Sequence, residues 1–173
     1  MKLEVMTVQE FDAVYHLMEQ SFPRDEYRPY ERQRAVLDDP AYRIHVLRGE
    51  NGGIAAFITL WSLGDVAFVE HFAVEPSLRG GGIGSRLLSE IKGLYPGMIC
   101  LEVELPETDM ARRRIGFYER NGFVLNHYPY EQPAYDEQRA GVPLLIMTTP
   151  RAIDEKEFAR MRDALYRRVY HCL

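Results

Sequence analysis

The fold is decided by the stretch Val74-Glu75-Pro76-Ser77-Leu78-Arg79-Gly80-Gly81-Gly82-Ile83-Gly84-Ser85. It follows an apolar, strand-like segment over residues 66–74 and holds four glycines and one arginine. It leads into a helical pattern whose apolar positions fall on one face, namely Ile83, Leu87, Leu88 and Ile91. The stretch therefore predicts a strand, a glycine turn and a helix in succession.

The glycine turn is expected to bind an anion. A turn that feeds a helix start leaves backbone N–H groups unpaired, and the positive end of the helix dipole adds to their attraction. Glycine lets a phosphate approach the backbone closely, and the Arg79 guanidinium adds a charge with bidentate geometry. The predicted contacts to a phosphate or pyrophosphate are Arg79, Gly80, Gly81, Gly82, Ile83, Gly84 and Ser85.

Two common phosphate loops do not match this turn. A Walker loop requires Lys and then Ser or Thr after its last glycine, whereas Ser85-Arg86 follows Gly84. A dinucleotide fingerprint that starts at Gly80 requires glycine where Ser85 stands. The remaining pattern, Arg-x-x-Gly-x-Gly over residues 79–84, resembles the coenzyme A pyrophosphate loop of the GNAT acyltransferase superfamily. A plain glycine-rich turn explains the loop equally well when the loop is taken alone.

A second block, over residues 99–124, supports the same resemblance. In GNAT enzymes the loop helix is followed by a Leu-Glu-Val strand and then by a helix with Phe-Tyr-Glu-x-x-Gly-Phe. The matching residues are Leu101-Glu102-Val103 and Phe117-Tyr118-Glu119 through Gly122-Phe123. The chain is identified as a member of this superfamily, and the resemblance covers most of residues 1–149.

The order of predicted elements is β-α-α-β-β-β-α-β-α-β-β, which indicates an α/β domain with a mixed, mostly antiparallel sheet. By resemblance, the twisted sheet splays at its centre between the strands near 66–74 and 98–104 and is flanked by helices. The GNAT domain is expected over 1–149. A further helix over 153–170, in an extension of residues 150–173, is expected to pack on this domain or on the partner subunit of a homodimer.

Composition limits the function further. The 173 residues are 46% hydrophobic, and no apolar run approaches the ~18 residues of a membrane span. The absence of a signal-peptide pattern, with only two cysteines, Cys100 and Cys172, predicts a cytoplasmic protein. A net charge of -5 argues against nucleic-acid binding, and the five scattered histidines indicate no metal site.

Acyl transfer to an amine requires a base, an oxyanion donor, an acid and a grip on coenzyme A. Tyr118 is the candidate acid, because a phenol with a pKa of ~10 can protonate a leaving thiolate. By resemblance, this tyrosine is the usual acid of the family. The alternative is a tyrosine that only anchors its helix in the core, as neighbouring Phe117 does.

The candidate bases are Glu102 and Glu70, which the sequence leaves about even. By resemblance to ribosomal-protein N-acetyltransferases, the Glu of the Leu-Glu-Val strand acts through water. Glu70 is the rival, because a carboxylate among apolar strand residues requires a cationic partner or a function. A water chain that uses both also satisfies the chemistry, and a structural salt bridge is the alternative for each. His71 should point away from Glu70 by strand alternation.

The resemblance assigns the remaining cofactor contacts. The backbone of Phe72, Ala73 and Val74 should bind the pantetheine arm like an added strand and supply the oxyanion donor. Arg113, with Arg112, is expected to reach the other end of coenzyme A, unless both belong to a solvated helix face. Many relatives carry Asn where Asp109 stands, so no pantetheine contact is assigned to Asp109.

Acetyl-CoA is therefore the expected co-substrate, with no metal, and the acceptor is a primary amine of a small molecule or peptide. Aromatic segments over 22–30 and 126–135, with the carboxylates of Asp25, Glu26 and Glu131, are candidates to close over an amine. Two other interpretations remain, a non-catalytic acyl-CoA sensor and a nucleotide-dependent enzyme. The sequence names no particular acceptor.

Overall fold

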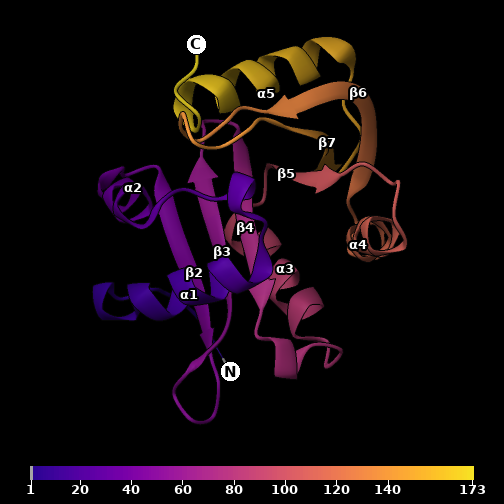
Figure 1. Cartoon of the computed structure of the whole chain (residues 1–173). Coiled ribbons are helices and arrows are strands. Elements are labelled where there is room, and N and C mark those ends of the chain that lie inside the picture. Colours follow the sequence, from indigo (N-terminus) through magenta and orange to yellow (C-terminus); the bar gives the residue numbers. More distant parts are fainter. Residues whose placement is uncertain (1) are drawn as a thin grey trace.

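Seven strands form one sheet in the computed structural model, which describes residues 2–173 (Figure 1). The strand order is β1-β2-β3-β4-β5-β7-β6. The strands are β1 (Leu3–Val5), β2 (Tyr42–Arg48), β3 (Ile54–Ser62), β4 (Val66–Val74), β5 (Met98–Glu104), β6 (Val124–Gln132) and β7 (Val142–Thr149). The helices are α1 (Phe11–Ser21), α2 (Tyr30–Ala35), α3 (Ile83–Leu94), α4 (Asp109–Arg120) and α5 (Glu155–Arg168). Short 3-10 turns include η1 (Val8–Glu10) and η2 (Arg24–Glu26).

The sheet opens at its centre. Within residues 2–173 every strand pair is antiparallel except β4 and β5, which run parallel. The β4–β5 ladder ends at the pair Val69 and Leu101. Beyond it, β4 stays paired to β3 through Val74, and β5 stays paired to β7 through Glu104. The predicted splay is therefore confirmed, and residues 70–74 have no ladder partner on the β5 side (Figure 1).

Two apolar layers cover the two faces of the sheet. One contains the buried faces of α1 and α5 together with Phe68 and Cys100. The other contains the buried face of α3, with Ile115 of α4, Val69 and Leu101. Successive residues of β4 and β5 thus alternate between the two layers, as the period of a strand requires.

Helix α5 packs against β6 of the same chain. Phe158 stacks on Tyr128 with ring centroids 4.9 Å apart, and Met161 and Leu165 are buried beside it. The helix begins at a capping box in which Asp154 accepts from the Glu157 N–H. Residues after Pro150 are therefore part of the same apolar layer as α1.

The predicted elements are present with small shifts at their ends. The first strand ends at Val5, and a capping box between Thr7 and Glu10 begins η1 directly after it. The Thr108 side chain accepts from the Ala111 N–H and begins α4, and Gly122 follows its end at a φ of 88°. Within residues 2–173, no helix is both long enough and apolar enough to cross a bilayer.

Candidate active site

The glycine turn before α3 has the backbone of an anion site. Gly80 and Gly82 have φ values of 84° and 79°, in the left-handed region that disfavours other residues. The first hydrogen bond of α3 runs from the Arg86 N–H to the Gly82 carbonyl. The N–H groups of residues 83–85 therefore have no partner inside the helix and lie at its positive end.

Arg79 and Gly84, also predicted to contact the phosphate, have different roles in this turn. Arg79 is exposed, and its Nε donates to the Val74 carbonyl at 3.1 Å, so the guanidinium lies over the end of β4. Gly84 serves packing, because a Cβ there would lie 3.1 Å from Phe117 Cζ and 3.3 Å from Phe72 Cζ. The absence of a side chain at position 84 lets the start of α3 approach these two rings.

Of the arginines of α4, Arg112 and Arg113 are the two expected to reach coenzyme A, and they differ in their contacts. Arg112 pairs with Asp109 at 2.5 Å and donates to the Pro106 carbonyl, so both of its contacts lie at the start of its own helix. Arg113 is exposed on the same helix. A contact from Arg113 to coenzyme A remains a prediction.

The splayed half of β4 carries a bulge. Val69 pairs with Leu60 and Phe72 pairs with Ile58, so Thr59 faces two residues of β4, Glu70 and His71. Past the bulge, Phe72, Ala73 and Val74 still pair with β3, and their outer backbone edge faces the gap toward β5. Phe72 and Val74 are partly exposed, which leaves that edge open to an added strand.

The bulge overturns the expected orientation of His71. Its Nε2 donates to the Glu26 carbonyl at 2.7 Å, and its ring lies 6.4 Å from that of Tyr135, which also contacts Glu70. The extra residue in β4 places both side chains on one side of the strand. Burial lowers the pKa of His71, so the ring stays neutral with its Nδ1 enclosed and unpartnered within residues 2–173.

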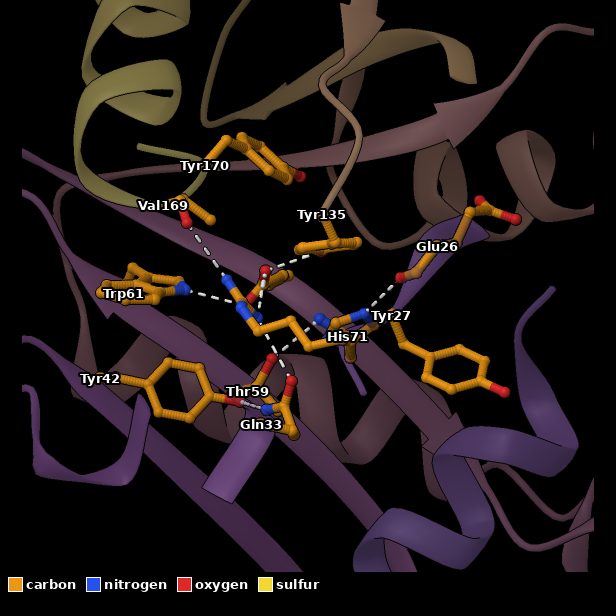
Figure 2. A network of polar contacts seen from close by, with 12 residues as sticks. Glu26, Tyr27, Gln33, Tyr42, Thr59, Trp61, His71, Tyr135, Val169 and Tyr170 are labelled. Carbon is orange, nitrogen blue, oxygen red and sulfur yellow. Dashed lines mark hydrogen bonds and ion pairs between the residues drawn. The ribbon is translucent and has the colours of Figure 1, made fainter. Parts of the chain in front are cut away.

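Glu70 is bound on all sides by polar groups of the protein, and Figure 2 shows two of them, Trp61 and Tyr135. Its side chain is fully buried and forms an ion pair with Arg28 at 2.8 Å. Trp61 Nε1 and the Tyr135 hydroxyl donate to its two carboxylate oxygens at 2.8 and 2.7 Å. Burial opposes its charge, but Arg28 and these donors outweigh burial and hold its pKa below the usual range. Glu70 is therefore a stable anion that the protein already satisfies.

Glu102 has a different environment on the neighbouring strand. The Tyr130 hydroxyl donates to Oε2 at 2.5 Å and the Tyr170 hydroxyl donates to Oε1 at 2.7 Å. No cation forms an ion pair with Glu102 within residues 2–173. Burial raises its pKa to about 8, although the two phenol hydrogen bonds lower it. Glu102 can therefore exchange a proton near neutral pH.

Tyr118 lies on the opposite face of the splay. Its ring packs edge-on against Phe123 at 5.7 Å and against Phe72 of β4 at 6.5 Å. Burial raises its pKa to about 12, and its hydroxyl has no hydrogen-bond partner within residues 2–173. The phenol is thus protonated and available as a donor beside the open edge of β4.

A third carboxylate lies on the Glu102 side. Glu26 of η2 is partly buried, and burial together with nearby Glu104 raises its pKa to about 7. Glu104 itself forms an ion pair with Arg114 of α4. Because Glu26 also raises the pKa of Glu102, the predicted acceptor segment over 22–30 places a carboxylate near Glu102.

Sequence reasoning missed five partners of the two glutamates. They are Arg28, Trp61 and Tyr135 around Glu70, and Tyr130 and Tyr170 on Glu102. One signal was available, because a carboxylate within an apolar strand requires a cation, and Arg28 lies in the segment over 22–30. No sequence pattern indicates that Tyr170 reaches Glu102 of β5.

Comparison with known proteins agrees with this geometry. The profile of the acetyltransferase (GNAT) family matches residues 11–123. A GNAT-family protein from Bacteroides thetaiotaomicron is 34% identical, with 99% of each chain covered and a TM-score of 0.90. No curated protein matches the chain significantly.

Two enzymes of lower identity share the fold. Ribosomal-protein-S18-alanine N-acetyltransferase from Escherichia coli is 22% identical, with a TM-score of 0.61 over 90% of this chain and 96% of that one. A variant of spermidine N-acetyltransferase from Vibrio cholerae is 15% identical, with a TM-score of 0.64 over 86% and 94%. At these identities the likeness concerns the fold alone.

Proposed function

The chain belongs to the GNAT acetyltransferase family, and we propose that it moves an acetyl group from acetyl-CoA to a primary amine by direct attack. The observation that carries the proposal is the splay between β4 and β5, with Glu102 on one face and Tyr118 on the other. A thioester bound along β4 would lie between a proton acceptor and a proton donor. The amine would enter from the side of Glu26 and Glu102.

Coenzyme A would be held by groups that are unpaired in the protein. The diphosphate binds the N–H groups at the start of α3 and the guanidinium of Arg79. The pantetheine arm pairs with the outer edge of β4 at Phe72, Ala73 and Val74. A backbone N–H of the same edge stabilises the oxyanion that forms when the amine attacks.

Glu102 is assigned as the proton acceptor. When the amine nitrogen bonds to the thioester carbon, it must lose a proton, directly or through one water, to a group with a suitable pKa. A carboxyl with a pKa of about 8 meets this need better than Glu70, whose charge is already balanced by Arg28. Glu70 is therefore proposed to organise the site rather than to take the proton.

Tyr118 is assigned as the proton donor. Collapse of the tetrahedral intermediate breaks the carbon–sulfur bond and leaves a thiolate of coenzyme A. The Tyr118 phenol gives its proton to that sulfur and recovers it from solvent. Its free hydroxyl and its contact with Phe72 of β4 support this role.

The proposal is tested by measuring release of free thiol from acetyl-CoA with a panel of small amines and peptides. Transfer to at least one primary amine is expected, with the acetylated product identified by mass spectrometry. Calorimetry with coenzyme A, NAD and ATP identifies the bound ligand. If the protein binds acetyl-CoA tightly but acetylates no amine, it is a sensor, and the proposal is wrong.

A further inference from the structure

We propose that Tyr170, in the segment that follows α5, is a positioning residue that orients Glu102 for proton transfer. The inference rests on the proposed role of Glu102 and adds a residue from outside the range matched by the family profile, residues 11–123. It assigns to the C-terminal segment a part in the reaction, in addition to its packing on β6.

The two oxygens of Glu102 are each bound by one phenol. Tyr170 donates to Oε1 at 2.7 Å and Tyr130 donates to Oε2 at 2.5 Å. These tyrosines come from different elements and are 8% and 6% exposed, respectively. Because a carboxylate oxygen accepts more than one hydrogen bond, each oxygen keeps a lone pair for a water or an ammonium group. The two phenols therefore fix the orientation of the carboxylate and leave each oxygen able to accept one more hydrogen bond.

Tyr170 is itself held on three sides. The carbonyl of neighbouring Val169 accepts from Arg28 at 3.2 Å, and the Tyr170 ring lies 5.3 Å from that of Tyr135. The Tyr170 N–H donates to the Leu165 carbonyl at 3.1 Å. Both backbone and ring are thus anchored, which is the condition for a preorganised contact.

The chain then reverses. His171 has a φ of 54°, in the left-handed region, and the next N–H, of Cys172, donates to the Tyr166 carbonyl at 2.9 Å. This bond closes a turn after α5 at the residue that follows Tyr170. This turn fixes the backbone next to Tyr170 and so sets the direction in which the Tyr170 side chain points.

The Glu70 network provides the support for this contact. Arg28 contacts both Glu70 and the Val169 carbonyl, and Tyr135 contacts both Glu70 and the Tyr170 ring. The buried Glu70 carboxylate on β4 therefore holds Arg28 and Tyr135, and these two residues position the Tyr170 phenol against Glu102 of β5. Figure 2 shows Tyr135, Val169 and Tyr170 on the same side of the network.

Tyr170 should affect the pH profile of the reaction. A phenol that donates to a carboxylate stabilises its ionised form, so loss of the Tyr170 hydroxyl raises the pKa of Glu102. The ionisable groups that influence Glu102 from the surrounding elements are Glu26, Glu70, Cys100, Tyr130, Tyr135 and Tyr170. Among these, only Tyr130 and Tyr170 donate a hydrogen bond to it within residues 2–173.

The test compares Tyr170→Phe with the wild type by kcat/KM as a function of pH, with one acceptor amine. We expect the acidic limb to move upward by about one pH unit, because the ionised form of Glu102 loses one of the two hydrogen bonds that stabilise it. The loss is about tenfold near pH 7 and largely disappears well above the shifted pKa. Affinity for coenzyme A should not change.

Tyr166→Phe is the matched control. Tyr166 lies on α5, and its hydroxyl donates to the Glu131 carbonyl rather than to Glu102. Its substitution removes one phenol hydroxyl and keeps the ring, so the acidic limb should stay in place. If Tyr170→Phe lowers kcat/KM equally at every pH, or leaves it unchanged, the positioning role is wrong.

A second measurement does not depend on turnover. Carbon-13 NMR of labelled glutamate, assigned with Glu102→Gln, gives the titration of Glu102 directly in the wild type and in Tyr170→Phe. An upward shift of the midpoint supports the inference, and an unchanged midpoint overturns it. If the wild type acetylates no amine, the proposed function fails, while the NMR titration still decides whether Tyr170 controls Glu102.

Discussion

Glu70 and Glu102 occupy equivalent positions on β4 and β5, each one residue beyond the last paired residues, Val69 and Leu101. Their surroundings differ in whether a positive charge balances the carboxylate. Glu70 has an arginine in contact, whereas Glu102 has two phenols and no paired cation within residues 2–173. The same residue type at the same level of the splay therefore has a lowered pKa on one strand and a raised pKa on the other.

Glu102→Gln should abolish most of the activity without weakening the fold. Loss of the proton acceptor is expected to lower kcat/KM by about 100-fold or more. The pKa of Glu102 is raised to about 8 from 4.5, so its contribution to stability is lost as the pH rises through 8. Thermal unfolding at pH 5 and pH 9 should show the variant gaining stability relative to the wild type at pH 9.

Glu70→Gln should destabilise the protein strongly. The change leaves Arg28 charged and buried without its partner, which costs about 3–5 kcal/mol in comparable buried pairs. Because the pKa of Glu70 is lowered, its contribution is present above 4.5 and is lost as the pH falls through its folded value. Urea unfolding at pH 7 measures the loss.

The exposed pair Arg86–Glu90 provides the comparison for that substitution. Its partners are 53% and 33% exposed, so Glu90→Gln should cost no more than about 0.5 kcal/mol. Equal losses for Glu70→Gln and Glu90→Gln would contradict the assignment of Glu70 as a buried structural anion.

Tyr118→Phe should slow the reaction and preserve the fold. The hydroxyl has no hydrogen-bond partner within residues 2–173, so its removal breaks no internal contact. As the proposed acid, it should account for about a 100-fold loss in kcat, with unchanged affinity for coenzyme A. An unchanged kcat in a well-folded variant would show that Tyr118 only anchors its helix.

Gly82→Ala should raise the KM for acetyl-CoA and lower stability. Position 82 has a φ of 79°, which costs a residue with a side chain about 1–2 kcal/mol. Relief of this strain would turn the N–H groups at the start of α3 away from the diphosphate. Initial-rate kinetics and thermal unfolding measure the two effects.

Gly93→Ala, in the last turn of α3, is the control for Gly82→Ala. A Cβ at position 93 meets no atom outside the neighbouring helix backbone within 4 Å, so alanine should stabilise the helix by up to about 0.5–1 kcal/mol. A similar gain at position 82 would mean that the turn does not require its left-handed backbone.

The sequence predicted the fold well because its signals are local. The apolar pattern predicted both β4 and α3, and the glycine turn predicted the start of α3. The glycine turn and Tyr118 belong to motifs with fixed spacing, so their places followed from the resemblance. The splay itself came from that resemblance and not from any residue pattern.

The division of roles between Glu70 and Glu102 could not be predicted, because it depends on distant contacts. Arg28 and Tyr170 come from segments far apart in the chain, and only the folded sheet brings them to the two carboxylates. The prediction that His71 points away from Glu70 was wrong for another reason. Strand alternation assumes an unbroken ladder, and the bulge opposite Thr59 leaves no mark in the sequence.

The family profile ends at residue 123, whereas both phenols on Glu102 belong to later residues. Membership of the family is thus recognised from residues 11–123, which include Glu102, whereas the phenols proposed to orient that carboxylate come from later residues. Homologues gathered by their coenzyme loop alone would mix enzymes with unlike substrates. Sorting them by the residues that stand at Tyr130 and Tyr170 is expected to group those that share the proposed arrangement around Glu102.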